Sequence, residues 1–342
     1  MEREKFGVCK DGNGAYLYTI SGHSLTAKLT DFGAALVSLF VKDKNGSALD
    51  VVMGYDTLAQ YEADTAYLGV TAGRCANRIA KGVFKLGGKE YRLDCNDGPN
   101  HLHGGFCGFG KKLWKAEQTD ESSVKFTLLS PDGDQGYPGN LIACVVYAIK
   151  GDSLKISYRG MADGKTVFNL TNHSYFNLAG QGGGDILGHE LAINADSVTA
   201  IDETLCPTGE LMPVAGTPFD FRKAKKIGKD IGSDHIQMKY GKGYDHNFAL
   251  NHTGGADAEV FCEESGIIMR VYTDSPGMQF YSGNFLNGGI TLKGGRKASY
   301  RGGLCLETQF FPDAVNHPSF KSPVIEAGEC YGYFTRFEFG TK

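Results

Sequence analysis

The sequence of 342 residues lacks the features that mark membrane, disulfide-rich and nucleic-acid-binding proteins. Its longest apolar runs, near residues 34–41 and 141–149, are far too short to span a bilayer. The nine cysteines are scattered and form no Cys-x-x-Cys pair, so neither a disulfide framework nor a structural zinc site is indicated. The net charge is -4 and no long basic run occurs, which argues against nucleic acid and membrane surfaces as partners.

The first residues, Met-Glu-Arg-Glu-Lys, lack the apolar core of a secretory signal. Hydrophobic residues make up 41% of the chain and charged residues 22%, which is ordinary for a soluble globular protein. We therefore expect a cytoplasmic protein whose ligand is a neutral, polar small molecule.

Glycine, in contrast, is abundant, with 48 residues spread along the chain and no collagen-like period. Dispersed glycine among Thr, Tyr and Phe is typical of many short strands joined by tight turns. Residues 15–20, 24–29 and 34–41 read as such strands, and Asn45-Gly46 is the clearest hairpin signal. We find no repeat and no linker, so the sequence predicts one all-β domain over residues 1–342.

The rest of the chain adds two short helices and one long loop region to the predicted strands. Residues 55–67 fit one short helix, and a second short helix is expected around 222–226. The chain is otherwise β-rich. Residues 331–339 alternate aromatic and polar side chains and are expected to close the sheet. The proline-containing stretch 202–242 reads as a long loop region that forms a wall of a cleft.

The stretch from Phe168 to Leu178 is unusually polar for a buried strand. Phe168 and Leu170 share one face, but from Asn172 onward hydrogen-bonding side chains occupy almost every position. An unpaired buried polar group costs about 1–3 kcal/mol, so these side chains are expected to project into a cleft. His173 there can donate or accept a proton at physiological pH, although a core histidine satisfied by its neighbours is the competing interpretation.

A second polar stretch contains His101 and His103, which at i and i+2 would lie on one face of a strand. Metal-binding cupins also begin with His-x-His, but they continue with a carboxylate where this chain has Cys107, Gly108 and Phe109. The metal interpretation is therefore disfavoured. The pair Gly104-Gly105 instead suggests a backbone that another group approaches closely.

Charged side chains mark two more places. Glu307 ends an apolar run, where a carboxylate is costly to bury without partners. It is therefore expected either to form a structural ion pair or to act as a general base. Arg74 and Arg78 stand among small residues with Asn77 between them. They form either a solvated surface turn or a set of fixed donors for ligand oxygens.

Taken in order, these motifs resemble the aldose 1-epimerase (galactose mutarotase) family. The resemblance is carried by Gly-Arg-Cys-Ala-Asn-Arg-Ile at 73–79, Asn-His-Leu-His-Gly-Gly at 100–105, Thr-Asn-His-Ser-Tyr-Phe-Asn-Leu at 171–178, Tyr-Asp-His-Asn-Phe at 244–248, Pro-Gly-Met-Gln-Phe-Tyr at 276–281 and Leu-Glu-Thr-Gln-Phe-Phe-Pro at 306–312. The match runs from about residue 15 to 340.

The resemblance implies a large antiparallel β-sandwich of the galactose mutarotase-like supersandwich kind, with an open sugar-binding cleft. It also implies a monosaccharide substrate (galactose or glucose), no cofactor, no metal, and a monomer or weak homodimer. His173 would be the proton donor to the ring oxygen and Glu307 the base for the anomeric hydroxyl. The residues expected to hold the sugar are Asn77, Arg78, His103, Ser174, Tyr175, Asp245 and Gln279. The ring that faces the sugar is expected to be Tyr175, Phe280 or Phe285.

Three other functions remain open from sequence. A glycosidase needs two carboxylates flanking a bond, and Asp245 with Glu307 would have to supply them. A sugar-binding β-sandwich would keep the pocket without the chemistry. An epimerase for a phosphorylated hexose needs extra basic residues, for which Arg74 is the adjacent candidate.

Overall fold

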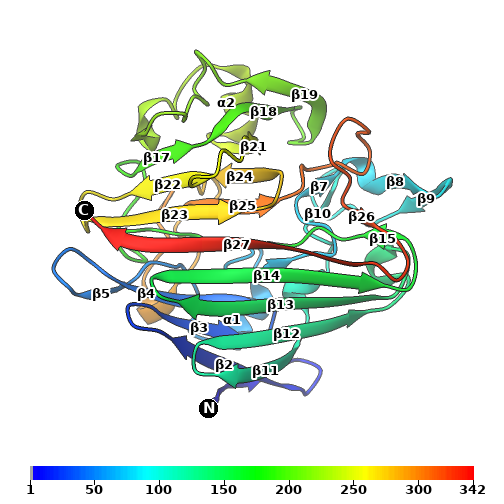
Figure 1. Cartoon of the computed structure of the whole chain (residues 1–342), viewed down its shortest axis with the longest axis horizontal. Coiled ribbons are helices and arrows are strands. Elements are labelled where there is room, and N and C mark those ends of the chain that lie inside the picture. Colours follow the sequence, from blue (N-terminus) through cyan, green and yellow to red (C-terminus); the bar gives the residue numbers. More distant parts are fainter. Residues whose placement is uncertain (1–2) are drawn as a thin grey trace.

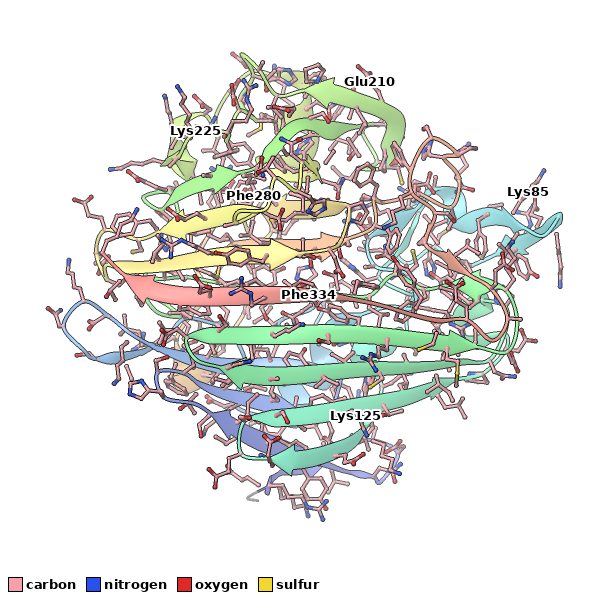
Figure 2. The ribbon with its side chains drawn as sticks, in the orientation of Figure 1. Lys85, Lys125, Glu210, Lys225, Phe280 and Phe334 are labelled. Atoms are coloured by element: carbon pink, nitrogen blue, oxygen red, sulfur yellow. The ribbon has the colours of Figure 1, made fainter. Side chains whose placement is uncertain are left out.

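In the computed structural model, which describes residues 3–342, a nine-stranded antiparallel sheet runs across the front of the molecule (Figure 1). Its strands, in spatial order, are β11 (Lys115–Asp120), β12 (Ser123–Ser130), β13 (Leu141–Lys150), β14 (Ser153–Ala162), β27 (Cys330–Thr341), β23 (Ile267–Thr273), β22 (Ala258–Phe261), β17 (Glu190–Ile193) and β20 (Lys225–Lys226). Buried and more exposed residues alternate along β12 and β13, as in a sheet with one face on the core. Figure 2 shows Lys125 and Phe334 on the front of this sheet.

Two five-stranded antiparallel sheets and several short strand pairs complete the β-structure. One sheet contains β1 (Arg3–Val8), β2 (Gly14–Ser21), β3 (Thr26–Thr30), β4 (Ala35–Lys42) and β5 (Ala48–Asp50). The other has the order β19 (Pro207–Pro213), β18 (Ala195–Ile201), β21 (Asp245–Leu250), β24 (Gly277–Tyr281) and β25 (Cys305–Gln309). The pairs are β10 (His101–Leu102) with β7 (Arg78–Ile79), β16 (Thr171–Asn172) with β6 (Thr71–Ala72), β15 (Thr166–Val167) with β26 (Val324–Ile325), and β8 (Val83–Leu86) with β9 (Lys89–Arg92).

Helical structure is confined to short segments. The α-helices within residues 3–342 are α1 (Leu58–Ala63) and α2 (Ile236–Gly241). Single 3-10 turns lie at Ala80–Gly82, Phe109–Lys111, Asp134–Gly136, Ile227–Lys229 and Lys293–Gly295. Neither these helices nor any other in the described part of the chain is long and apolar enough to cross a membrane.

The sheets pack through aromatic side chains, which is the sandwich arrangement that the resemblance implied. Tyr18 of β2 meets Phe126 of β12 edge to face at 5.9 Å, and Phe126 meets Tyr147 of β13 at the same separation. Phe337 of β27 lies 5.0 Å from Phe176, which is part of the polar stretch 168–178. Such contacts stabilise the fold beyond simple burial and join the front sheet to the layers behind it.

Most of the sequence-predicted elements are confirmed. The strands β2, β3 and β4 overlap the predicted ranges 15–20, 24–29 and 34–41, and Gly46 has the positive φ of 82° that its hairpin turn requires. The helix expected in 55–67 is α1, and the side chain of its N-cap residue Thr57 accepts a hydrogen bond from Gln60 N–H.

Two element predictions are wrong. Residues 222–226 form no helix, because Lys225 and Lys226 pair with β17 and extend the front sheet at its open edge. The helix of this region is α2, further along the chain. The last strand, β27, does not close the sheet but lies at its centre between β14 and β23, where it joins two groups of strands.

Candidate active site

A cavity of about 390 Å³ lies between the strands β21, β24 and β25, the start of β7, and the segments that follow β10 and β16. This is the size of a small-molecule site. The sequence-predicted residues that line it are Asn77, Arg78, His103, His173, Tyr175, Asp245 and Glu307. Segments far apart in the sequence therefore meet at one place, as the polar stretches suggested.

The two proposed proton-transfer residues face each other in this cavity. Nε2 of His173 lies 3.7 Å from Oε1 of Glu307, and both side chains are almost completely buried. His173 follows β16 and is fixed by its backbone, whose N–H donates to the Val70 carbonyl. Glu307 is the middle residue of β25 and pairs with Gln279 of β24. Its Oε2 accepts no hydrogen bond from any residue in 3–342, which leaves a buried acceptor for a ligand.

Burial opposes the charged form of both groups. It lowers the pKa of His173 to about 4. It also raises the pKa of the Glu307 carboxyl well above its ordinary value, an effect that Asp245 strengthens and Arg78 weakens. The ring of His173 is enclosed by stacked aromatic rings, Tyr175 at 5.1 Å and Tyr67 at 5.9 Å between centroids. Without a ligand, the pair therefore favours a neutral imidazole and a protonated carboxyl.

His103 is held as a hydrogen-bond donor toward the cavity. Its Nδ1 accepts the backbone N–H of Asn77 at 3.1 Å, so the proton of the neutral ring resides on Nε2. Burial, followed by the neighbouring His173 and Arg78, keeps the pKa of His103 well below its usual value, so the ring is neutral. It lies 5.1 Å from the ring of His173, edge to face.

This tautomer also decides whether the site suits a metal ion. The possible ligand atoms of His103, His173 and Glu307 lie within 4.8 Å of one another, and two imidazoles with a carboxylate are a common donor set. A ligating nitrogen needs a free lone pair, but Nδ1 of His103 is engaged by Asn77 and Nε2 carries the proton. The residues present fit an oxygen-rich organic ligand better than a metal.

The expectation that His101 and His103 share a face is wrong. His103 has a left-handed backbone, with φ at 50°, so the alternation of a strand ends before it. The ring of His101 is bound instead between the Asp94 carbonyl, at 2.8 Å from Nδ1, and the Tyr137 hydroxyl, at 2.8 Å from Nε2. The predicted close approach at Gly104 is confirmed, because a Cβ there would lie 1.7 Å from the Gly73 carbonyl oxygen.

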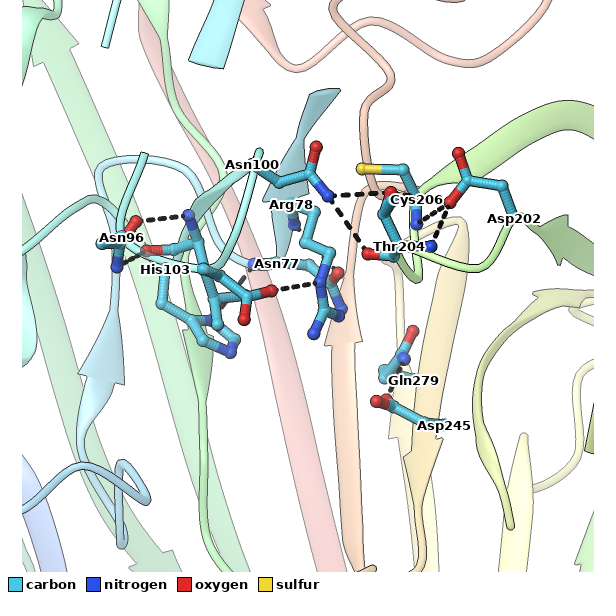
Figure 3. A network of polar contacts seen from close by, with 12 residues as sticks. Asn77, Arg78, Asn96, Asn100, His103, Asp202, Thr204, Cys206, Asp245 and Gln279 are labelled. Atoms are coloured by element: carbon cyan, nitrogen blue, oxygen red, sulfur yellow. Dashed lines mark hydrogen bonds and ion pairs between the residues drawn. The ribbon is translucent and has the colours of Figure 1, made fainter. Parts of the chain in front are cut away.

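Arg78 and Asp245 supply opposite charges to the same cavity (Figure 3). Nε of Arg78 donates to Oδ2 of Asp97 at 2.8 Å, and the side chain is buried. Burial alone would lower the pKa of Arg78, but Asp245 and Asp97 outweigh it and raise this pKa. Burial raises the pKa of Asp245, against the influence of Arg78 and of Gln279, whose Nε2 donates to Oδ1 of Asp245 at 2.6 Å. Gln279 thus reaches the cavity through Asp245.

Of the other sequence-predicted residues, most lie outside the cavity. Ser174 is buried outside the cavity lining. Phe280 cannot offer its ring to a ligand, because it is fully buried and stacked on Tyr244 at 5.0 Å, whereas Phe285 lies on the cavity rim with half of its surface exposed. Arg74 is buried too, and its guanidinium donates to protein groups that include the carbonyls of Pro138 and Gly139, so it is not free for a ligand phosphate.

Sequence reasoning missed several lining residues, among them Tyr67, Asp97, Leu205 and Tyr281. Asp97 lies in an Asn-Asp-Gly-Pro turn, which signals only a turn. Tyr67 and Leu205 have positive φ values of 60° and 66°, conformations that cost bulky residues about 1–3 kcal/mol and gather at functional sites. No sequence pattern reveals such angles. Leu205 is the lining residue from 202–242, so the prediction that this region forms a cleft wall holds at that point.

The whole chain is similar to known proteins of one kind. The family model described as aldose 1-epimerase matches residues 16–338. A rat protein named galactose mutarotase is 46% identical over 342 residues, covering 99% of this chain and 98% of its own length. An Escherichia coli protein named aldose 1-epimerase is 38% identical over 346 residues, covering 99% of both chains. A crystal structure of an aldose epimerase homologue from C. elegans superimposes with a TM-score of 0.89, at 32% identity over 96% of this chain and 99% of that one.

Proposed function

This chain belongs to the aldose 1-epimerase family and is an isomerase that acts on carbohydrates, and from this premise we propose that it interconverts the α and β anomers of galactose and glucose at the cavity around His173 and Glu307. The observation that carries the proposal is the 3.7 Å approach of Nε2 to Oε1 inside a buried, ligand-sized cavity. The ring oxygen and the anomeric hydroxyl are bonded to the same sugar carbon, so one acid and one base that line the same cavity can serve both.

The reaction needs only proton transfers. The Glu307 carboxylate removes the proton of the anomeric hydroxyl while the His173 imidazolium gives its Nε2 proton to the ring oxygen, and the C1–O bond of the ring breaks. The free aldehyde rotates about C1–C2, and the ring closes on the opposite face with both transfers reversed. Each positioned group of this kind contributes about 10²–10⁴-fold to the rate.

The pKa directions fit this cycle. Ring opening converts an imidazolium and a carboxylate into an imidazole and a carboxylic acid, so the pair keeps one proton to share throughout. Burial favours the two neutral forms, through the lowered pKa of His173 and the raised pKa of Glu307. The site thus favours the charge state that accompanies the open-chain aldehyde.

The remaining residues are proposed to bind the sugar. Arg78 and the Nε2–H of His103 offer donors to hydroxyl and ring oxygens, and His103 can stabilise negative charge that develops on them. Asp245 offers acceptors to two hydroxyl groups, with Gln279 fixing its carboxylate. Asn77 supplies the N–H that orients His103, and Tyr175 supports the ring of His173.

The alternatives fit the geometry less well. In a glycosidase, Glu307 would work with a second carboxylate. Asp245 lines the same cavity, but the group that faces Glu307 at 3.7 Å is the imidazole of His173, which a glycosidase does not need. A phosphorylated hexose would need Arg74, which is bound to backbone carbonyls. A binding protein without catalysis would have no use for an acid and a base placed together. The chain is proposed to act as a monomer or weak homodimer.

Polarimetry of freshly dissolved α-D-galactose and α-D-glucose, with and without the protein, tests the proposed reaction. An enzyme accelerates the approach to the equilibrium rotation in proportion to its concentration. A binding protein leaves the rate at the spontaneous value, and a glycosidase releases monosaccharides from a disaccharide. Either of those results would contradict the proposed function.

A further inference from the structure

The side of the His173 ring that faces away from Glu307 contacts a cysteine. Sγ of Cys305 lies 3.6 Å from Nδ1 of His173, within hydrogen-bond range for sulfur, and both side chains are buried. Cys305 and Glu307 are two residues apart on β25, so they lie on the same face of the strand. One short strand therefore contacts both nitrogens of the proton-transferring imidazole.

The proposed reaction places a requirement on that ring. Nε2 must give up its proton and take it back, so the second proton has to remain on Nδ1 in both states. A neutral imidazole otherwise exchanges between its two tautomers, and the tautomer with a bare Nδ1 cannot accept a proton at Nε2. In metal and triad sites, the partner of the second nitrogen sets the tautomer in this way.

We propose that Cys305 is a positioning residue for the reaction, in which Sγ accepts the Nδ1–H of His173 and so leaves Nε2 as the nitrogen that exchanges protons with the sugar. This inference rests on the proposed function. Sulfur is a weak acceptor that brings no charge, because burial raises the pKa of the thiol well above its usual value and keeps it protonated. A carboxylate at this position would hold the imidazolium more tightly and oppose release of the Nε2 proton.

Three variants separate this role from simple packing. Cys305→Ala removes the acceptor, Cys305→Ser replaces it with a hydroxyl, and Cys262→Ala removes a buried thiol near the end of β22, outside the cavity lining. We expect Cys305→Ala to lower kcat by about 3- to 10-fold, the effect of one weak hydrogen bond, with KM unchanged. In Cys305→Ser, kcat should return to near the wild-type value. In Cys262→Ala, kcat should equal that of the wild type.

The tautomer itself is read by ¹⁵N NMR of histidine-labelled protein at neutral pH, with the His173 signals assigned by their loss in His173→Asn. The proton of His173 is expected on Nδ1 in the wild type and in Cys305→Ser, and distributed over both nitrogens in Cys305→Ala. A wild-type ring with its proton on Nε2, or an unchanged tautomer in Cys305→Ala, overturns the proposal. The wild-type spectrum gives this answer even if a variant fails to fold, and it does not depend on activity, so failure of the proposed function is detected separately by polarimetry.

Discussion

The backbone N–H of Asn77 donates to Nδ1 of His103 at 3.1 Å, and this single contact gives the cavity a neutral donor instead of a metal ligand. The donor is aimed at the same space as His173 and Glu307, whose potential ligand atoms lie within 4.8 Å of it. Proton transfer is then left to His173 and Glu307. Their facing atoms, Nε2 and Oε1, are not engaged by a backbone N–H in this way.

The first prediction concerns metal ions. Because the lone pair of His103 Nδ1 is engaged and Nε2 is protonated, the cluster has no complete ligand set. Dialysis against EDTA should leave kcat and KM unchanged, and an equimolar addition of Zn²⁺ should not inhibit. Polarimetry measures both. Loss of activity on chelation that Zn²⁺ restores would show that His103 is a ligand and that the assigned tautomer is wrong.

The second prediction separates binding from proton transfer. Asp245→Ala and Arg78→Ala remove partners of sugar hydroxyls, so each should chiefly raise KM and change kcat much less. Arg222→Ala is the matched control, because Arg222 lies on the surface and pairs with Asp220 outside the active-site cavity. Initial rates over a range of galactose concentrations give both constants. If KM stays at the wild-type value in both cavity variants, these side chains are structural.

The third prediction is the pH dependence of kcat/KM. The pair is active while it shares one proton, and it takes up a second when the pH falls through the lowered pKa of His173, about 4. Activity should therefore persist below pH 6.5, the ordinary value for histidine, and decline toward about 4. Rates are corrected for spontaneous mutarotation, and samples returned to neutral pH check that the protein survived. A decline centred near 6.5 would show that burial does not lower this pKa.

The proton-transfer pair could be predicted from the sequence, but the residues that surround it could not. His173 and Glu307 stand out because polar residues interrupt apolar strands, a local signal that survives without coordinates. The contact of Cys305 with Nδ1 and the support of Arg78 by Asp97 join segments distant in sequence, so no local pattern contains them. His101 was misplaced for a similar reason, since the positive φ of the residue after Leu102 ends the strand alternation.

The same contrast holds for the fold. Turn signals such as Asn45-Gly46 located the hairpins, because a positive φ at glycine is a local property. The helix expected at 222–226 was wrong because an open edge of the front sheet takes up Lys225 and Lys226, and that edge exists only in the folded chain. The cavity rim at Phe285 depends in turn on how the segment after β24 packs.

The fourth prediction concerns stability. The N–H of Leu178 donates to Nε2 of His189 at 3.0 Å, which requires a neutral ring, and burial lowers the pKa of His189 to about 4. Between about 6.5 and 4, the unfolded chain binds a proton there that the folded chain does not, so stability falls as the pH falls. His189→Gln keeps an acceptor and does not titrate. Its unfolding free energy should lose about 1.4 kcal/mol less per pH unit in this window than that of the wild type.

Urea denaturation at several pH values measures this difference. Above pH 7 the two proteins should show the same pH dependence, because the histidine is neutral in both the folded and the unfolded wild type. If the unfolding free energies of the two proteins change in parallel with pH throughout the acid range, His189 titrates normally in the folded protein and its contact with Leu178 is not maintained.

The central claim, that Glu307 exchanges the proton of the anomeric hydroxyl, is tested most directly by the kcat of Glu307→Gln for α-D-galactose in the polarimeter. Glutamine has nearly the same shape and fills the same place on β25, but it cannot take up a proton. We expect kcat to fall by about 10²–10⁴-fold with KM changed little. A kcat close to the wild-type value in a folded Glu307→Gln protein would contradict the account.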